Sequence, residues 1–205
     1  MSEEVIEFVK IKADRRSYSR RRLVHGVGIN DADYKCEGTF NGTRAVCPVY
    51  RKWKDMLMRC YSKKYQSKQT TYKGCYVCKE WLTFSVFSKW YEKHNVVGYH
   101  LDKDLKKKGN KEYCPEYCLF IPHYVNSLIN FKQDREYPLG VSYDKTNSKY
   151  LVVCQVEGTL KHIGRYLDLR EAEVAYILVK NCEIRKSMKK YPNLAKYIEN
   201  YLLTL

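Results

Sequence analysis

The chain has 205 residues, 44% of them hydrophobic, so it is long enough for one large or two small domains and apolar enough to fold. Its 38 Lys and Arg against 23 Asp and Glu leave a net charge of +15. Together with 20 Tyr, that excess favours a nucleic acid as partner over a basic protein kept soluble by its charge. With no 18-residue apolar run and no apolar signal segment, we expect no membrane contact and a cytoplasmic location.

Residues 1–24 contain a basic segment, which we predict to be an N-terminal arm. Its five arginines are Arg15, Arg16, Arg20, Arg21 and Arg22. Such a run is typical of a phosphate-binding arm and equally of a solvated tail, so both interpretations stay open. We take Arg20, Arg21 and Arg22 as candidate nucleic-acid contacts.

Two helices are predicted in the next part of the chain. After a turn-rich stretch at 25–34 and a loop at 36–47, residues 48–61 carry one apolar stripe, made of Val49, Trp53, Met56, Leu57 and Cys60. A polar loop at 62–74 precedes a second helix, from about Lys79 to Lys93. Its many aromatic side chains are predicted to form a core.

The middle of the chain has the order strand, loop, strand, helix. Residues 99–105 are predicted to form a strand, 106–117 a loop, 118–121 a short apolar strand, and Pro122 opens a helix that ends near Phe131. A polar linker follows at 132–138.

Three strands and a helix are predicted after the linker. The strands are 139–143, 150–156 and 159–166, joined by two tight turns. Asp168 with Glu171 resembles a capping box and predicts a helix start. The apolar face of that helix consists of Leu169, Ala172, Ala175, Tyr176, Val179 and Cys182. Pro192 ends the pattern, and a short helix with Leu194 and Ile198 closes the chain.

Several linked motifs in residues 25–130 resemble phage-encoded HNH proteins related to homing endonucleases. The matching pieces are GVGINDADY (26–34), WKDMLMRCY (53–61), TYKGCYVCKEW (71–81), LDKD (101–104), GNKEYCPEYC (109–118), FIP (120–122) and Asn126. The resemblance implies a ββα-metal core, in which a strand hairpin and a helix hold one divalent ion, Mg²⁺ or Mn²⁺, at a DNA phosphate.

The resemblance places two metal ligands and departs from the family at two positions. Asp102 matches the metal-binding Asp, and Asn126 matches the Asn of the helix. Lys103 stands where active enzymes carry the general-base His, and the middle Asn of the motif falls near Tyr117. By strand alternation His100 and Asp104 share the face of Asp102, so His100 is a candidate base and Asp104 a second ligand.

Other residues near this motif have open roles. Lys103 is a candidate catalytic residue, as a base or, at lower energetic cost, as a phosphate contact. His123 lies in the first turn of the helix and either reaches the site or faces water. The basic run Lys106, Lys107 and Lys108 is a candidate nucleic-acid contact. Each histidine also has an ordinary surface or packing role as its alternative.

The nine cysteines, an odd number, are expected to be reduced thiols. Two close pairs flank the motif: Cys75 with Cys78, and Cys114 with Cys118. Four sulfurs at these spacings are compatible with a structural Zn²⁺ site. Small buried packing residues are the favoured alternative, because the similar proteins carry single cysteines at positions 60, 78 and 118.

Residues 139–188 resemble an APETALA-type (ethylene-response-factor-type) DNA-binding domain. The matching pieces are GVSY (140–143), YLVVC (150–154), IGRY (163–166) and LREAEVAY (169–176). The resemblance implies a three-stranded sheet that enters the major groove of DNA, with a helix packed behind it. The implied outward contacts are Ser142, Tyr143, Lys145, Lys149, Gln155, Lys161 and Arg165.

The sequence thus predicts an α+β protein: an arm (1–24), an HNH-like nuclease domain (25–131), a linker (132–138) and a sheet-and-helix DNA-binding domain (139–205). The first hypothesis is a metal-dependent endonuclease acting on double-stranded DNA in the cytoplasm of a phage's host. The alternative is a catalytically inactive protein on the same scaffold that binds DNA or RNA, or that inhibits an acidic host protein.

Overall fold

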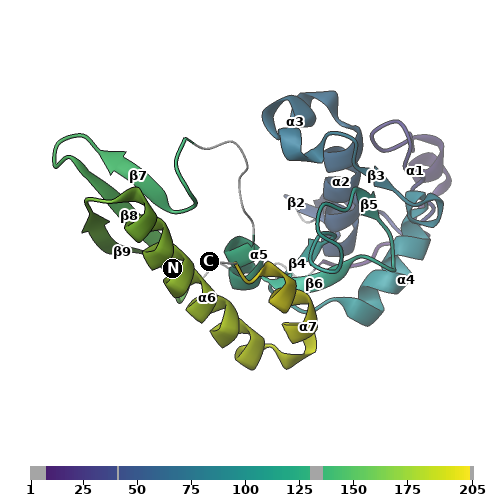
Figure 1. The fold of residues 1–205 in the computed structure, drawn as a ribbon. Helices are drawn as coiled ribbons and strands as arrows, with labels where there is room; N and C mark the ends of the chain where they lie inside the picture. Colours follow the sequence, from purple (N-terminus) through teal and green to yellow (C-terminus); the bar gives the residue numbers. More distant parts are fainter. Residues whose placement is uncertain (1–7, 41, 130–135, 204–205) are drawn as a thin grey trace. The chain divides into compact units, whose positions relative to one another are not determined.

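The computed structural model of the chain describes residues 8–40, 42–129 and 136–203 (Figure 1). The fold is α+β, as predicted, with helices and several small sheets. The chain divides into two compact units. The N-terminal unit comprises the described residues up to Val97 together with Leu101–Phe120; the C-terminal unit comprises Gly98–His100 and the described residues from Ile121 onward. None of the described helices is long and apolar enough to cross a membrane.

The predicted domain boundaries compare with this division as follows. The two units divide between Phe120 and Ile121, inside the predicted 25–131 domain, so the helix after that point groups with the C-terminal sheet. Residues 132–135 of the predicted linker, and residues 1–7 of the predicted arm, lie outside the described part of the chain.

The described part of the basic segment is folded. Helix α1 (Arg15–Ser19) is capped by Asp14, whose Oδ1 accepts from the Ser17 N–H at 2.7 Å. The Arg21 guanidinium donates to the backbone oxygens of Asn30 and Tyr34, at 3.0 and 3.1 Å. These bonds fasten the segment to the turn-rich stretch that follows it.

Two segments predicted as loops contain regular structure. Residues 36–47 include the hairpin β1 (Glu37–Phe40) and β2 (Thr43–Val46), and residues 62–74 include α3 (Lys63–Lys68) and the 3₁₀ turn η1 (Thr70–Tyr72). The prediction of loops was wrong there. These elements are short and polar, and tertiary pairing rather than an apolar period supports them.

The core of the N-terminal unit includes the buried side chains of α2 (Pro48–Tyr61), η2 (Lys79–Leu82) and α4 (Phe84–His94). Trp53 is fully buried, and its Nε1–H donates to the Trp81 oxygen at 2.7 Å. The predicted stripe of α2 is confirmed except that Tyr50 rather than Val49 is buried. The predicted 79–93 helix is divided at Thr83, which forms an isolated bridge with Ile29.

The predicted order strand, loop, strand, helix is confirmed. Strand β4 (Tyr99–Asp102) pairs with β6 (Leu119–Pro122), and α5 (His123–Ile129) follows. β4 ends at Asp102, earlier than predicted. The intervening loop contributes β5 (Glu112–Tyr113), which pairs in parallel with β3 (Tyr76–Val77).

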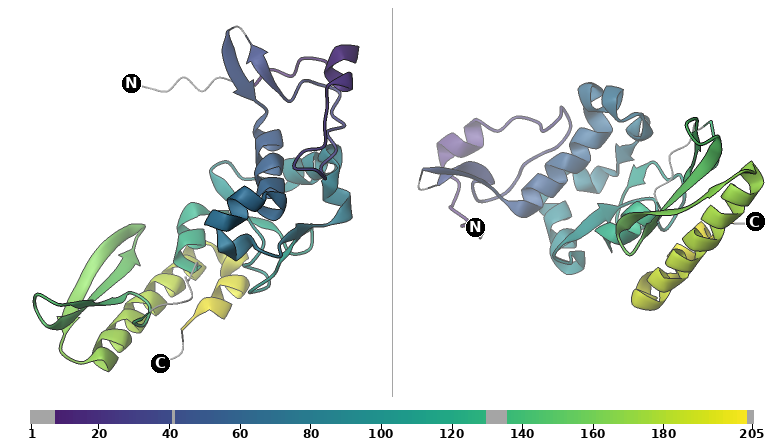
Figure 2. Two further views of the ribbon diagram at one scale, coloured as in Figure 1. Left: turned by 90° about the horizontal axis from the view of Figure 1, so that it is seen from above. Right: turned by 90° about the vertical axis from the view of Figure 1, so that its left-hand side faces the viewer.

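The C-terminal unit has the predicted three-stranded antiparallel sheet with a helix on one face (Figure 2). The strands are β7 (Val141–Asp144), β8 (Lys149–Val156) and β9 (Thr159–Tyr166), and the helix is α6 (Leu169–Lys190). The Asp168 side chain accepts from the Glu171 N–H at 2.9 Å, which confirms the predicted helix start. The centre of the core consists of Val141, Val152, Cys154, Ala172 and Tyr176.

The end of the chain packs against the second half of α6. The short elements are η3 (Pro192–Leu194), α7 (Ala195–Ile198) and η4 (Glu199–Tyr201), and they bury Leu194, Ile198 and Tyr201. Cys182, predicted on the apolar face of α6, is exposed. The buried stripe instead continues along the helical period through polar residues, namely Lys180, Glu183 and Ser187.

Glu183 is the centre of a buried polar network in the C-terminal unit. Its side chain is 2% exposed. Oε2 accepts from the Tyr124 hydroxyl of α5 at 2.7 Å and from the Glu157 N–H of the β8–β9 turn at 2.9 Å, and Oε1 accepts from Lys186 Nζ at 2.7 Å. One carboxylate therefore joins α5, the sheet and α6.

The network predicts a specific loss of stability in acid. Burial opposes ionisation of Glu183, but the bonds from Lys186, the Glu157 amide and Tyr124 outweigh it and lower its pKa below the ordinary 4.5. A lowered native pKa stabilises the fold above the unfolded pKa, and this contribution is lost as pH falls through the native value. We expect Glu183→Gln to lower the unfolding free energy at pH 7 by about 2 kcal/mol and to flatten its pH dependence below pH about 4.5.

Urea denaturation from pH 3 to 7 measures both effects. Glu199 is exposed, so the matched substitution Glu199→Gln should change stability by less than about 0.5 kcal/mol. Equal pH profiles of the Glu183 variant and the wild type would contradict the assignment.

Candidate functional site

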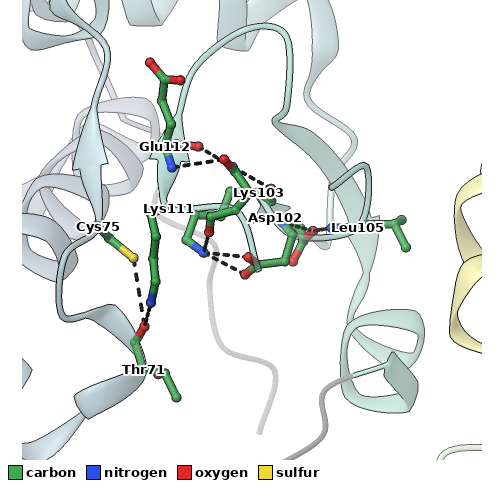
Figure 3. Close-up of polar contacts among 9 residues, drawn as sticks. Thr71, Cys75, Asp102, Lys103, Leu105, Lys111 and Glu112 are labelled. Atoms are coloured by element: carbon green, nitrogen blue, oxygen red, sulfur yellow. Dashed lines mark hydrogen bonds and ion pairs between the residues drawn. The ribbon is translucent and has the colours of Figure 1, made fainter. Parts of the chain in front are cut away.

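Asp102, the predicted metal ligand, is the last residue of β4. Its Oδ1 accepts two backbone N–H groups, from Asp104 at 2.9 Å and Leu105 at 2.6 Å, and so shapes the turn that follows the strand (Figure 3). No described residue donates a hydrogen bond to Oδ2. Burial raises the pKa of Asp102, more than these two bonds lower it. A partly buried carboxylate with one open oxygen is suited to hold a cation.

Lys103, which the resemblance predicted at the general-base position, is buried, with 5% of its surface exposed. Its Nζ donates to both carboxylate oxygens of Asp104, at 2.7 and 2.8 Å, and to the Asn110 oxygen at 2.6 Å (Figure 3). Asn110 Nδ2 in turn donates to the Lys103 oxygen at 2.9 Å and to the Glu112 oxygen at 2.6 Å.

This geometry gives Lys103 a structural role. An ammonium has three N–H donors. Here they donate to the Asp104 carboxylate and the Asn110 carbonyl, and these bonds fix the conformation of the loop after β4. The side chain is directed away from solvent, so the arrangement favours neither a phosphate contact nor proton transfer. Asp104 is also engaged: since β4 ends at Asp102, strand alternation does not extend to Asp104, and its carboxylate faces Lys103.

The hydrogen bonds of Lys103 predict that the protein loses stability when the ammonium is removed. Lys103→Met keeps the length of the side chain but leaves the Asn110 oxygen without its donor, so we expect the unfolding free energy to fall by about 2 kcal/mol. Lys107→Met, a change at an exposed position of the same loop, should cost less than about 0.5 kcal/mol. Denaturation midpoints compare the two, and an unchanged midpoint for Lys103→Met would remove the structural assignment.

In the C-terminal unit, the structure brings two histidines together. The rings of His100, from β4, and His123, the first residue of α5, lie 5.0 Å apart at an interplanar angle of 72°. Asn126 lies one helical turn after His123 and is partly buried. Its side chain makes no hydrogen bond with any residue that the structure describes, so its amide oxygen is available to a ligand.

The four cysteines of the proposed zinc alternative are free thiols. Burial raises the pKa of Cys75 and Cys118, and that of Cys78 to about 11. Cys75, Cys114 and Cys118 are buried and Cys78 is partly buried, a placement that small packing residues can take. Across residues 8–40, 42–129 and 136–203, no three or more His, Cys, Asp or Glu side chains cluster as a metal site.

The basic loop after β4 has mixed exposure. Lys106 Nζ donates to the Glu116 oxygen at 2.7 Å, whereas Lys107 and Lys108 are exposed. Lys107 lies over the ring of Tyr117, 4.9 Å from its centre. The resemblance predicted the middle Asn of the motif near Tyr117, and the ring of Tyr117 contacts a lysine instead.

The predicted DNA-contacting residues of the sheet do not share one face. Ser142, Leu151 and Arg165 are aligned across the three strands on the face opposite the core, and by alternation Lys149 and Gln155 share it. Tyr143 is paired with Tyr150, and Lys161 with Cys154. Because Tyr150 and Cys154 belong to the core side of the sheet, Tyr143 and Lys161 lie on that side too. Lys145 lies in the exposed β7–β8 turn.

On the sheet face opposite the core, which we call the open face, Arg165 and Gln155 contact other residues of the C-terminal unit. Arg165 Nε lies 3.5 Å from Asp144 Oδ2. Gln155 Oε1 accepts from the Ser127 hydroxyl at 3.1 Å, and its Nε2 donates to the Gly158 oxygen at 3.4 Å. Reading a base would require Gln155 to release these partners. Lys145 is exposed, and Lys149 is half-buried.

Sequence reasoning did not predict that the basic segment lines a cavity of the N-terminal unit. It placed Arg16, Arg20, Arg21 and Arg22 in a basic arm, but it did not single out Lys35, which lines the same cavity. No local pattern reveals such a site, because its walls come from three separate segments of the chain.

No known protein family, curated protein or solved structure matches this chain.

Proposed function

We propose that this protein is a metal-dependent DNA endonuclease of the HNH type. The observation that carries the proposal is Asp102, a partly buried carboxylate at a strand end with Oδ1 fixed by two N–H groups and Oδ2 open. A helix Asn with an unengaged amide supplies the second oxygen ligand that the family resemblance implies. Mg²⁺ retains several waters, so one carboxylate and one amide are a sufficient protein contribution.

Each residue then has a defined task. By the family resemblance, Asp102 and Asn126 are the residues that would hold a divalent ion, which would supply positive charge at the scissile phosphate and at the departing oxygen. His100 is the candidate base, since Lys103 is held by the loop, and His123 lies against its ring. Lys103 and Asn110 keep the loop in the conformation that presents Asp102.

The proposed substrate is duplex DNA. The net charge of +15 supplies attraction to phosphates, and the open face of the C-terminal sheet, three strands wide, is narrow enough for a major groove. Arg165 and Lys149 lie on that face.

Conversion of supercoiled plasmid to open-circular and linear forms, in Mg²⁺ or Mn²⁺, tests the proposal. Nicking that is abolished by EDTA and by a change at Asp102 supports it. Wild-type nicking no greater than that of the Asp102→Ala variant would contradict the proposal.

The second candidate is a protein on the same scaffold that binds nucleic acid without cutting it. The burial of Lys103 favours this second candidate, because the position that the resemblance assigns to the general base carries a buried ammonium. DNA or RNA binding that persists without nicking, and that is unchanged in Asp102→Ala, would support this candidate. Retention of an acidic host protein in place of nucleic acid would indicate an inhibitor.

A further inference from the structure

The N-terminal unit contains a cavity of about 810 Å³ that none of the proposed catalytic residues lines. Its walls come from the segments 14–25, 30–37 and 50–54. Six Arg and Lys side chains line it against two acidic ones: Arg16, Arg20, Arg21, Arg22, Lys35 and Lys54 against Asp14 and Glu37. We name it the arginine cavity. Its volume is in the range of pockets that hold small ligands.

The two acidic residues of the arginine cavity are neutralised within it. Lys35 Nζ lies 2.9 Å from Asp14 Oδ2, and Lys54 Nζ lies 2.9 Å from Glu37 Oε2. The bond from Lys35 also holds the pKa of Asp14 well below its ordinary value, so the Asp14 carboxylate stays ionised across the neutral range. The excess positive charge of the cavity therefore resides on its arginines.

Three of the four arginines of the cavity have guanidinium groups without a hydrogen-bond or ion-pair partner among the described residues. Arg21 is held by the Asn30 and Tyr34 oxygens and lies over the Tyr18 ring, which makes it part of the wall. Arg16, Arg20 and Arg22 are exposed, and their guanidinium groups make no hydrogen bond or ion pair within the part of the chain that the structure describes. Guanidinium groups bind phosphate oxygens in a bidentate manner.

The rest of the lining is mixed, and its apolar part consists of Leu23, Val24 and Tyr50 together with Cys36. Ser17, His25 and Asn30 are its polar members. His25, with φ 52°, and Gly26, with φ 80°, form a tight turn closed by a bond of 2.9 Å from the Gly28 N–H to the Val24 oxygen. A non-glycine residue in the left-handed region is uncommon and marks a position worth testing for function.

We infer that the arginine cavity is a second nucleic-acid site, which holds one nucleotide of a strand by its phosphate and its base. Arg16, Arg20 and Arg22 bind the phosphate, and the Leu23, Val24 and Tyr50 wall receives the base. The inference rests on the proposed function only in taking nucleic acid as the ligand; it does not require cleavage.

Oligonucleotide binding in an Asp102→Ala background tests the inference without cleavage of the probe. Fluorescence anisotropy of a labelled single-stranded oligonucleotide is measured at several salt concentrations. The triple variant Arg16→Ala/Arg20→Ala/Arg22→Ala should bind at least about 10-fold more weakly, with the slope of log affinity against log salt reduced by about 2. The matched triple Arg15→Ala/Arg44→Ala/Arg51→Ala removes the same charge from exposed positions outside the cavity and should lose less than about 3-fold.

Competition identifies what the cavity recognises. A nucleoside 5′-monophosphate should displace the oligonucleotide at lower concentration than inorganic phosphate, and the cavity triple should abolish that difference. Equal losses in the two triples overturn the inference, as does equal competition by the two ligands. If the cavity triple unfolds, as judged by circular dichroism, Arg16→Ala and Arg15→Ala provide the same comparison on α1. Wild-type nicking is assayed separately, so a failed nuclease proposal and a failed cavity inference are distinguishable.

Discussion

Replacing Asp102 with asparagine is expected to reduce metal-dependent plasmid nicking by at least about 100-fold. Asparagine retains an Oδ1 that accepts the Asp104 and Leu105 N–H groups, so the turn after β4 is preserved. It removes the negative charge that draws a divalent cation. A bound cation contributes several kcal/mol to the transition state, and 1.36 kcal/mol corresponds to a factor of ten in rate.

A second measurement separates metal binding from other roles of Asp102. Mn²⁺ should raise the thermal midpoint of the wild-type protein and leave that of Asp102→Asn unchanged, because only a state that binds the ion is stabilised by it. Glu116 is an exposed carboxylate of the same loop, and Glu116→Ala should retain both the nicking and the Mn²⁺ shift. Nicking by Asp102→Asn at the wild-type rate would exclude Asp102 as a ligand.

The elements that could be predicted from the sequence are those with a strong period or a strong cap. Helix α2 has its predicted bounds because Pro48 opens an apolar stripe that must be buried. The three strands of the C-terminal unit are separated by turns that contain Asp144 and Gly158. In each case residues close together in the chain were sufficient to predict the element.

The parts that could not be predicted depend on partners distant in the chain. The β1–β2 hairpin and α3 lack an apolar period, and the polar stripe of α6 is buried because Glu183 meets Tyr124 and the Glu157 amide. The sequence indicates which residues are chemically able to act at the candidate site, such as Asp102 and His100. It does not show that Lys103 turns inward to Asn110, because Asn110 is brought there only by the folded loop.

Gly140 is expected to be the glycine least tolerant of substitution in the C-terminal unit. Its φ is +72°, and a Cβ there would overlap the Tyr176 ring and approach the Val153 oxygen to 2.6 Å. The left-handed conformation costs a non-glycine residue about 1–2 kcal/mol, and overpacking adds about 1–3 kcal/mol. We therefore expect Gly140→Ala to lower the unfolding free energy by about 3 kcal/mol, because Tyr176 is part of the core and the Val153 oxygen belongs to the backbone of β8.

Gly158 provides the matched control. Its φ is +83°, but a Cβ there would meet only the Tyr124 ring, at 3.9 Å, so Gly158→Ala should cost only the conformational term of about 1 kcal/mol. Urea denaturation of the two variants isolates the packing contribution at Gly140. If DNA binding depends on the C-terminal sheet, Gly140→Ala should also weaken it near the unfolding midpoint while Gly158→Ala retains it. Equal destabilisation by the two substitutions would mean that Tyr176 moves aside freely, and that the core behind the sheet is not packed as tightly as this close approach requires.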